Sequence, residues 1–223
     1  MTREELRRLI YTELLEDPDN PQYWGIDEVN EKINKAIYQY SKDTGAYKYR
    51  DTFNTTSGED TYNLPAYTID INFIAVKSAS DSSPTKIEKI YWKDIPLTST
   101  NGRPTKYVFL PSDLSVEGGE RLPSILLYPT PDDTYEVMYD IIRSASFPTD
   151  DSDILEIPDM YKYAIVYYTT YLLHLKNIDE ASQKKAAGYL ELYYMEIRDL
   201  INQFSEGYQV RKYNDLSLIH ISE

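Results

Sequence analysis

Two histidines, His174 and His220, are the only imidazoles of the 223-residue chain and the first candidates for acid–base chemistry. A catalytic histidine works with an activated nucleophile and with a carboxylate that orients its ring. The chain has no cysteine and no Gly-x-Ser-x-Gly sequence that would present a serine nucleophile. We therefore interpret His174 as a hydrogen-bonded residue at the end of a helix and His220 as part of a C-terminal tail.

Acidic side chains are densest at Asp150, Asp151 and Asp153, where a calcium-binding loop is the functional interpretation to test. An EF-hand loop needs glycine at its sixth position and glutamate at its twelfth. Counted from Asp151, these two positions hold Glu156 and Lys162. We therefore predict a solvated loop that leads into a helix, and no metal site.

The remaining motifs do not indicate an enzyme. Gly118-Gly119 is too short for a phosphate-binding loop and is not followed by Lys-Ser or Lys-Thr. The 37 acidic residues could supply two carboxylates for glycoside hydrolysis, but no pair stands out. We predict no catalytic residue and no cofactor, with a hydrolase kept as an open alternative.

The charge of the chain bears on its partners. The 23 Lys and Arg against 37 Asp and Glu give a formal net charge of −14, which repels a phosphate backbone and disfavours extended DNA or RNA binding. Such a chain could still line a channel through which DNA passes without binding. The start MTREELRRLI has no signal-peptide core, and the chain has no apolar run long enough for a membrane helix. We expect a soluble, unexported protein that is made in the cytoplasm.

Helices are predicted at the start of the chain. Thr2 and Glu5 form a capping-box pattern for a helix that runs to about residue 15. Asp27 is the predicted N-cap of a second helix that ends at Gly45. One apolar stripe of this second helix recurs at helical spacing and comprises Val29, Ile33, Ala36, Ile37 and Tyr40.

The sequence of the middle of the chain predicts β-structure. Short runs rich in β-branched and aromatic residues alternate with turn clusters, which indicates an antiparallel sandwich or barrel. The predicted strands lie at 69–73, 86–92, 106–110, 124–128 and 134–142.

Two further helices close the fold. Pro158 is the predicted first residue of a helix that runs to about residue 176. Asp179 is a candidate N-cap of a helix over 180–204. The fold class is therefore α+β, in which a bundle of N- and C-terminal helices carries an inserted antiparallel β-sandwich or barrel-like domain. The predicted parts are the N-terminal helices at 1–46, the β-domain at 47–146, the αα-hairpin at 147–206 and an extended tail at 207–223.

The helix that contains YKYAIVYYTTYLL (161–173) is apolar on nearly all sides, with five tyrosines in thirteen residues. Such a helix must be covered on nearly all sides. Its cover is either the rest of its own bundle or, in part, a neighbouring subunit. Tyrosine is enriched at subunit contacts, and further tyrosines follow in the next helix. The predicted interface residues are Tyr163, Tyr167, Tyr171, Tyr189, Tyr193 and Tyr194.

Several motifs, taken in order, resemble those of the tailed-bacteriophage head-to-tail adaptor family, also called connector or head-completion proteins. Each motif is weak alone, and their order and spacing over residues 2–205 carry the resemblance. They are YWGIDEVNEKINKAIYQY (23–40), TYNLP (61–65), INFIAVKS (71–78), RPTKYVF (103–109), ILLYPTPDDTYEVMYDI (125–141) and IPDMYKYAIVYYTTYLL (157–173).

The resemblance implies a structural virion protein at the head–tail junction. It implies a ring of about twelve copies between the phage portal protein and a downstream tail or nozzle protein, with DNA passing through its channel. The helical part would form the ring, and the β-domain would face outward or toward the tail. The C-terminal tail would clamp the portal through Tyr208, Val210, Tyr213 and Leu216.

Two alternatives stay open at this point. Residues 215–223, DLSLIHISE, resemble a translated sequencing adapter, and they also fit a genuine apolar tail strand or hook. The other class of function is a tail-associated β-sandwich that binds carbohydrate through exposed aromatic rings such as Trp92 and Tyr107.

Overall fold

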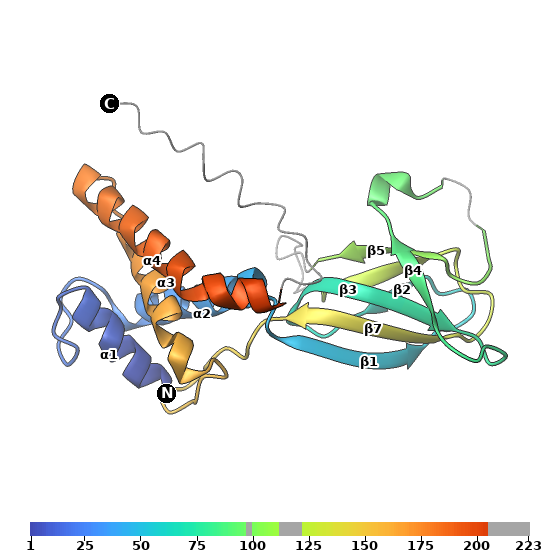
Figure 1. Ribbon diagram of the computed structural model, residues 1–223, viewed down its shortest axis with the longest axis horizontal. Helices are drawn as coiled ribbons and strands as arrows, with labels where there is room; N and C mark the ends of the chain where they lie inside the picture. Colours follow the sequence, from blue (N-terminus) through green and yellow to red (C-terminus); the bar gives the residue numbers. More distant parts are fainter. Residues whose placement is uncertain (97–99, 112–121, 205–223) are drawn as a thin grey trace. The chain divides into compact units, whose positions relative to one another are not determined.

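The computed structural model describes residues 1–96, 100–111 and 122–204 (Figure 1). The chain divides into two compact units. One unit joins Met1–Ala46 to Ala145–Glu223, so it contains helices from both ends of the sequence, and the other is Tyr47–Ser144.

Helix α1 (Arg3–Glu13) begins at the predicted capping box. The Thr2 hydroxyl oxygen accepts the amide N–H of Glu5 at 3.2 Å, and the Glu5 carboxylate accepts the amide N–H of Thr2 at 2.9 Å. The two groups thus satisfy two backbone donors that have no partner within the helix. Leu6 and Ile10 are buried, so the face of the helix that carries them packs inside the unit.

Helix α2 (Ile26–Thr44) begins earlier than predicted. Its N-cap is Gly25, which makes no side-chain cap, and Asp27 lies inside the first turn. The prediction that Asp27 is the N-cap is therefore wrong, although its charge faces the positive end of the helix dipole. At the other end Gly45 adopts φ 59° and donates its N–H to the Ser41 carbonyl, which confirms it as the helix terminator. The five residues of the predicted apolar stripe are all buried.

Helix α3 (Lys162–His174) and helix α4 (Glu180–Phe204) form the C-terminal hairpin. Pro158 precedes a short 3₁₀-helix, η2 (Asp159–Tyr161), and is not the first residue of the α-helix. The α3 helix is therefore 13 residues long and shorter than predicted. The Asp179 carboxylate accepts the amide N–H of Ser182 at 2.9 Å, which confirms Asp179 as the cap of α4. Helix α3 packs against α1, α2 and α4.

The second unit is built on one curled sheet. Within its described residues, seven strands run in the order β1-β7-β3-β4-β5-β6-β2. They are β1 (Lys48–Asn54), β2 (Thr61–Asn63), β3 (Thr68–Lys77), β4 (Thr85–Lys89), β5 (Lys106–Leu110), β6 (Ser124–Tyr128) and β7 (Glu136–Arg143), and the 3₁₀-helix η1 (Trp92–Asp94) follows β4.

The five predicted strands are all present, with shifted ends for three of them, but the predicted architecture is confirmed only in part. The strands make one sheet instead of the two of a sandwich. The β4–β5 pair is parallel, and the connection over 90–105 has the length that a parallel pair needs. Strands β1 and β2 were not predicted. Their side chains are almost all exposed, so they carry no apolar alternation.

The inside of the curl holds the core of this unit. Phe53 of β1 stacks on Tyr62 of β2 with ring centroids 4.9 Å apart, so the two edge strands approach each other. The buried core residues are Leu64, Ile71, Ile74, Val76, Tyr107, Ile125, Leu127, Tyr135, Val137, Tyr139 and Ile141.

Candidate functional site

Helix α3 buries threonines and leaves most of its tyrosines partly exposed. Thr169 and Thr170 are fully buried, together with Ala164, Ile165 and Val166. By contrast, the side chains of the predicted interface tyrosines of this helix reach the surface of the unit. Tyr163 is 36% exposed, and Tyr167 and Tyr171 are half-buried. Helix α3 therefore presents rings that this unit covers only in part.

The six predicted interface tyrosines fall into two groups. In the first, the rings of Tyr163 and Tyr167 lie 5.8 Å apart, and Tyr167 lies 6.2 Å from Tyr189 of α4. The second group contains Tyr171, Tyr193 and Tyr194, joined through Tyr168, with centroid distances of 4.8–5.3 Å.

Tyr193 differs from the other five because it has no exposed surface. Within its own unit its ring contacts those of Tyr168 and Tyr194, and its role at a subunit interface stays a prediction. Its hydroxyl donates to the Asp43 carboxylate at 2.8 Å, and the Gln39 amide donates to the same carboxylate at 2.8 Å. Burial raises the pKa of Asp43 above its usual range despite these two donors.

A surface hollow of about 580 Å³ lies beside the first group of tyrosines. We call it the α4 hollow. The Tyr189 hydroxyl donates to the backbone carbonyl of Glu13 at 3.3 Å and so joins α4 to the end of α1. The lining comprises Tyr167, Gly188, Tyr189, Leu192 and Met195, with the charged residues Glu13, Lys185 and Glu191.

His174 lies against the first group of tyrosine rings. It is the last residue of α3, as predicted, and its ring stacks on Tyr189 at 5.7 Å. The predicted hydrogen bond is absent at Nδ1, which is buried without a partner among the described residues. Burial, together with the charge of Lys185, lowers the pKa of His174. The lowered pKa favours the neutral imidazole, which packs as an aromatic ring against Tyr189. His220 lies outside the described residues.

The acidic loop at 150–153 anchors the N-terminal helix. The Asp151 carboxylate accepts two hydrogen bonds from the Arg7 guanidinium, at 2.7 and 2.8 Å, and one from Arg3 at 3.0 Å. These cations lower the pKa of Asp151 to about 2. The Asp153 carboxylate accepts the amide N–H groups of Thr149 and Asp150. The loop is therefore bonded internally and to α1, and it is not merely solvated.

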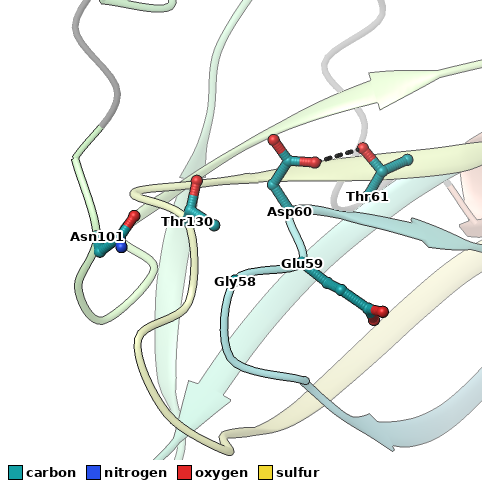
Figure 2. Close-up of a pocket in the computed structure, with 6 residues that line it drawn as sticks. All are labelled: Gly58, Glu59, Asp60, Thr61, Asn101 and Thr130. Carbon is teal, nitrogen blue, oxygen red and sulfur yellow. Dashed lines mark hydrogen bonds between the residues drawn. The ribbon is translucent and has the colours of Figure 1, made fainter.

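The sheet unit contains a polar hollow of about 620 Å³, shown in Figure 2. Asp60 accepts a hydrogen bond from the Thr61 hydroxyl at 2.8 Å, whereas Glu59 points in a different direction. The two carboxylates therefore do not converge on one substrate atom. Across the described ranges, no cluster of three His, Cys, Asp or Glu side chains could hold a metal ion. The other residues that line the hollow are Gly58, Asn101 and Thr130.

The family model of the SU10 adaptor protein matches residues 1–214. The chain belongs to the SU10 adaptor protein family. This match confirms the resemblance to phage head-to-tail adaptors, and it spans both units. A search of the curated proteins found no match.

Membership makes this SU10-type adaptor a structural protein of a phage and implies a place in the virion beside portal and tail proteins. The family is structural, which favours a protein without catalytic activity. Within the described part of the adaptor, no helix combines the length and the apolarity needed to cross a membrane.

The carbohydrate alternative for this adaptor loses one of its two named contacts. Tyr107 is 2% exposed and belongs to the core of the sheet, so the prediction that it is an exposed ring is wrong. Trp92 is 63% exposed, and its neighbour Tyr91 is also exposed. The predicted portal-binding residues Tyr208, Val210, Tyr213 and Leu216 all lie outside the described residues.

Two features of the adaptor, the α4 hollow and the buried Asp43 carboxylate, were not predicted from the sequence. One signal for the hollow was present: Gly188 stands alone inside a helical pattern, where glycine is unfavourable. Nothing in the sequence indicated that Asp43 is buried, because an aspartate near the end of an amphipathic helix is normally expected to be exposed to solvent.

Proposed function

We propose that this adaptor assembles into a ring that joins the phage portal to the tail and lets DNA pass through its channel. The observation that carries the proposal is the partly exposed tyrosine face of α3 and α4 in a chain of the SU10 adaptor family. Tyrosine combines a large ring with a polar hydroxyl group, so such a face can be exposed to solvent before assembly and buried in a subunit contact afterwards. The net charge of −14 supports a channel along which DNA slides.

In this proposal each part of the chain has one task. The helices of 1–46 and 147–206 form a bundle that builds the ring, with about twelve copies in the virion. The β-domain at 47–146 faces outward or toward a downstream tail or nozzle protein. The tail at 207–223 reaches the portal through Tyr208, Val210, Tyr213 and Leu216.

Co-elution with the portal protein of the same phage tests this function. The purified adaptor is mixed with assembled portal and passed through a size-exclusion column. The proposal expects the adaptor to move from its free position to the position of the portal, in several copies per portal. An adaptor that keeps its free elution volume in the presence of excess portal contradicts it.

A second candidate function is carbohydrate binding by the sheet unit. The observation that favours it is the adjacent exposed pair Tyr91 and Trp92, because aromatic rings at a surface can stack on sugar faces. A glycan array read with the wild-type chain and with Trp92→Ala decides this alternative. Binding that the substitution abolishes would support it, and an array without any bound glycan would remove it.

A further inference from the structure

Gly188 stands in the interior of α4, where glycine lowers helix stability relative to alanine. A Cβ atom added at this position would meet no atom within 4 Å. Among the described residues, nothing inside the chain therefore requires a glycine here. Gly188 is exposed and lines the α4 hollow, so a side chain at this position would take up space in the hollow.

The α4 hollow has the lining of a protein contact. Tyr189, Leu192 and Met195 give it aromatic and flexible apolar walls, and Leu192 and Met195 are exposed. Glu13 and Glu191 outnumber Lys185 among its charged residues, so the rim is acidic. A complementary occupant carries an apolar or aromatic group flanked by cations.

Helix α2 carries such a group on its outer face. Glu31, Lys35, Tyr38 and Lys42 are all exposed and recur at helical spacing, opposite the stripe that packs inside the unit. We call these four residues the α2 strip. Tyr38 is 42% exposed and is flanked by the two lysines, one turn away on either side. Glu31 pairs with Lys35 at 2.6 Å, so the strip carries a net charge of +1, and Lys42 is the lysine beside Tyr38 that lies outside this pair. This net positive charge and the exposed ring of Tyr38 complement the acidic, apolar-walled α4 hollow.

We propose that the α2 strip of one copy docks into the α4 hollow of the next copy, with Tyr38 over Gly188. The inference rests on the proposed ring and deepens it. A closed ring uses two different patches on each copy, one for each neighbour, and the strip and the hollow are two such patches. Gly188 then serves the contact between copies and not the fold of one copy.

Cysteine cross-linking tests this contact, because the chain contains no cysteine of its own. The variant Lys42→Cys/Glu191→Cys leaves Tyr38 and Gly188 in place and puts one thiol on each patch. Rings formed with portal are treated with a short bismaleimide linker and run on a denaturing gel. The expected result is a ladder of covalent oligomers, whereas each single-cysteine variant stays monomeric on the gel.

The glycine itself is tested by substitutions of increasing size. Gly188→Ala is expected to raise the Tm by about 2–4 °C, because alanine is the better helix former in a position with free space. The same change, and Gly188→Leu more strongly, is expected to weaken ring formation about tenfold or more by overpacking the contact. Ala187→Leu is the matched control, since Ala187 is exposed on α4 and does not line the hollow.

The outcomes separate this inference from the proposed function. If the wild type forms rings with portal and the double-cysteine variant gives no ladder, the inference is overturned and the ring stands. Dimers of Glu191→Cys alone would also overturn it, because they would show a symmetric contact. A wild-type chain that forms no ring with portal would contradict both the proposed function and this inference. A Gly188→Leu variant that assembles as well as Ala187→Leu contradicts the role of the glycine.

Discussion

Single charged residues in this chain stabilise contacts between segments, and their spacing in the sequence does not predict these contacts. Arg7 is buried except for a small fraction of its surface, and its guanidinium lies in a two-bonded pair with Asp151. Asp43 is also held by two donors, but both of these donors are uncharged. The two carboxylates therefore respond to pH in opposite directions.

Asp151→Asn is expected to lower the free energy of unfolding by about 1–2 kcal/mol at pH 7, because Arg7 loses a charged partner that is itself partly exposed. The folded-state pKa of Asp151, about 2, lies below the ordinary aspartate value. Its contribution to stability is therefore full above pH 4 or so and is lost as the pH falls toward 2. Urea unfolding at pH 7 and pH 3 measures both effects.

The matched control for this change is Asp19→Asn. Asp19 forms an ion pair at 2.7 Å with Arg8, which belongs to α1 as Arg7 does, but both side chains of this pair are exposed. We expect its effect to stay within about 0.5 kcal/mol. Equal losses for the two variants would contradict the assignment of Asp151 as an anchor of α1.

Asp43→Asn is expected to leave the chain as stable as the wild type, or more stable, at pH 7. The pKa of Asp43 is raised, so its contribution is full below the ordinary aspartate pKa of about 3.9 and is lost as the pH rises through the raised value. Asparagine keeps an acceptor for Tyr193 and carries no charge. Unfolding measured between pH 4 and pH 7 should show a fall for the wild type that is missing from the variant. The same fall in both would contradict the assignment.

At the scale of elements, α3 packs with polar atoms in its buried face. The hydroxyl oxygens of Thr169 and Thr170 have no hydrogen-bond partner among the described residues. An unpartnered buried hydroxyl costs stability. The helix is nonetheless the centre of its unit, in contact with the three other α-helices named above.

Thr169→Val and Thr170→Val are each expected to raise the free energy of unfolding by about 1 kcal/mol, because valine keeps the shape and removes the unpaired hydroxyl. The gain corresponds to about 2–4 °C in Tm. Thr12→Val is the control, since Thr12 is exposed and its hydroxyl donates to the Arg8 carbonyl. A loss of stability in the Thr169 or Thr170 variant would show that the hydroxyl has a partner.

The elements differ in how far their sequences predicted them. The apolar stripe of α2 recurs at helical spacing against a polar background, so it identified both the helix and its buried face. Helix α3 is apolar on nearly all sides, so no pattern could tell that Thr169 and Thr170 face inward. Strand β1 is held by backbone pairing to β7, and its exposed side chains carry no period.

At the scale of the whole molecule, the order of the motifs was the informative feature of the sequence. Motifs in the right order identified the adaptor family that the match over residues 1–214 shows. The α4 hollow depends on side chains from α1, α3 and α4 that meet only in the folded unit, so no local pattern could predict it. The same holds for the parallel β4–β5 pair, which depends on the path of the chain between those strands.

The net charge of −14 per chain leads to a prediction about DNA. The assembled adaptor should not retard linear double-stranded DNA on a gel at about 0.15 M salt, because like charges repel at distances within the screening length. Electrophoretic mobility of a labelled duplex with increasing adaptor measures this. Retardation that weakens steeply with added salt would show phosphate binding and would contradict a channel that lets DNA slide.

The ring that we propose forms where this chain assembles on the portal. Negative-stain electron microscopy of the adaptor mixed with the portal protein of the same phage tests it most directly. We expect portal particles that carry an additional ring with an open central channel. Bare portal particles beside monomeric adaptor, at concentrations where both proteins are folded, would contradict it.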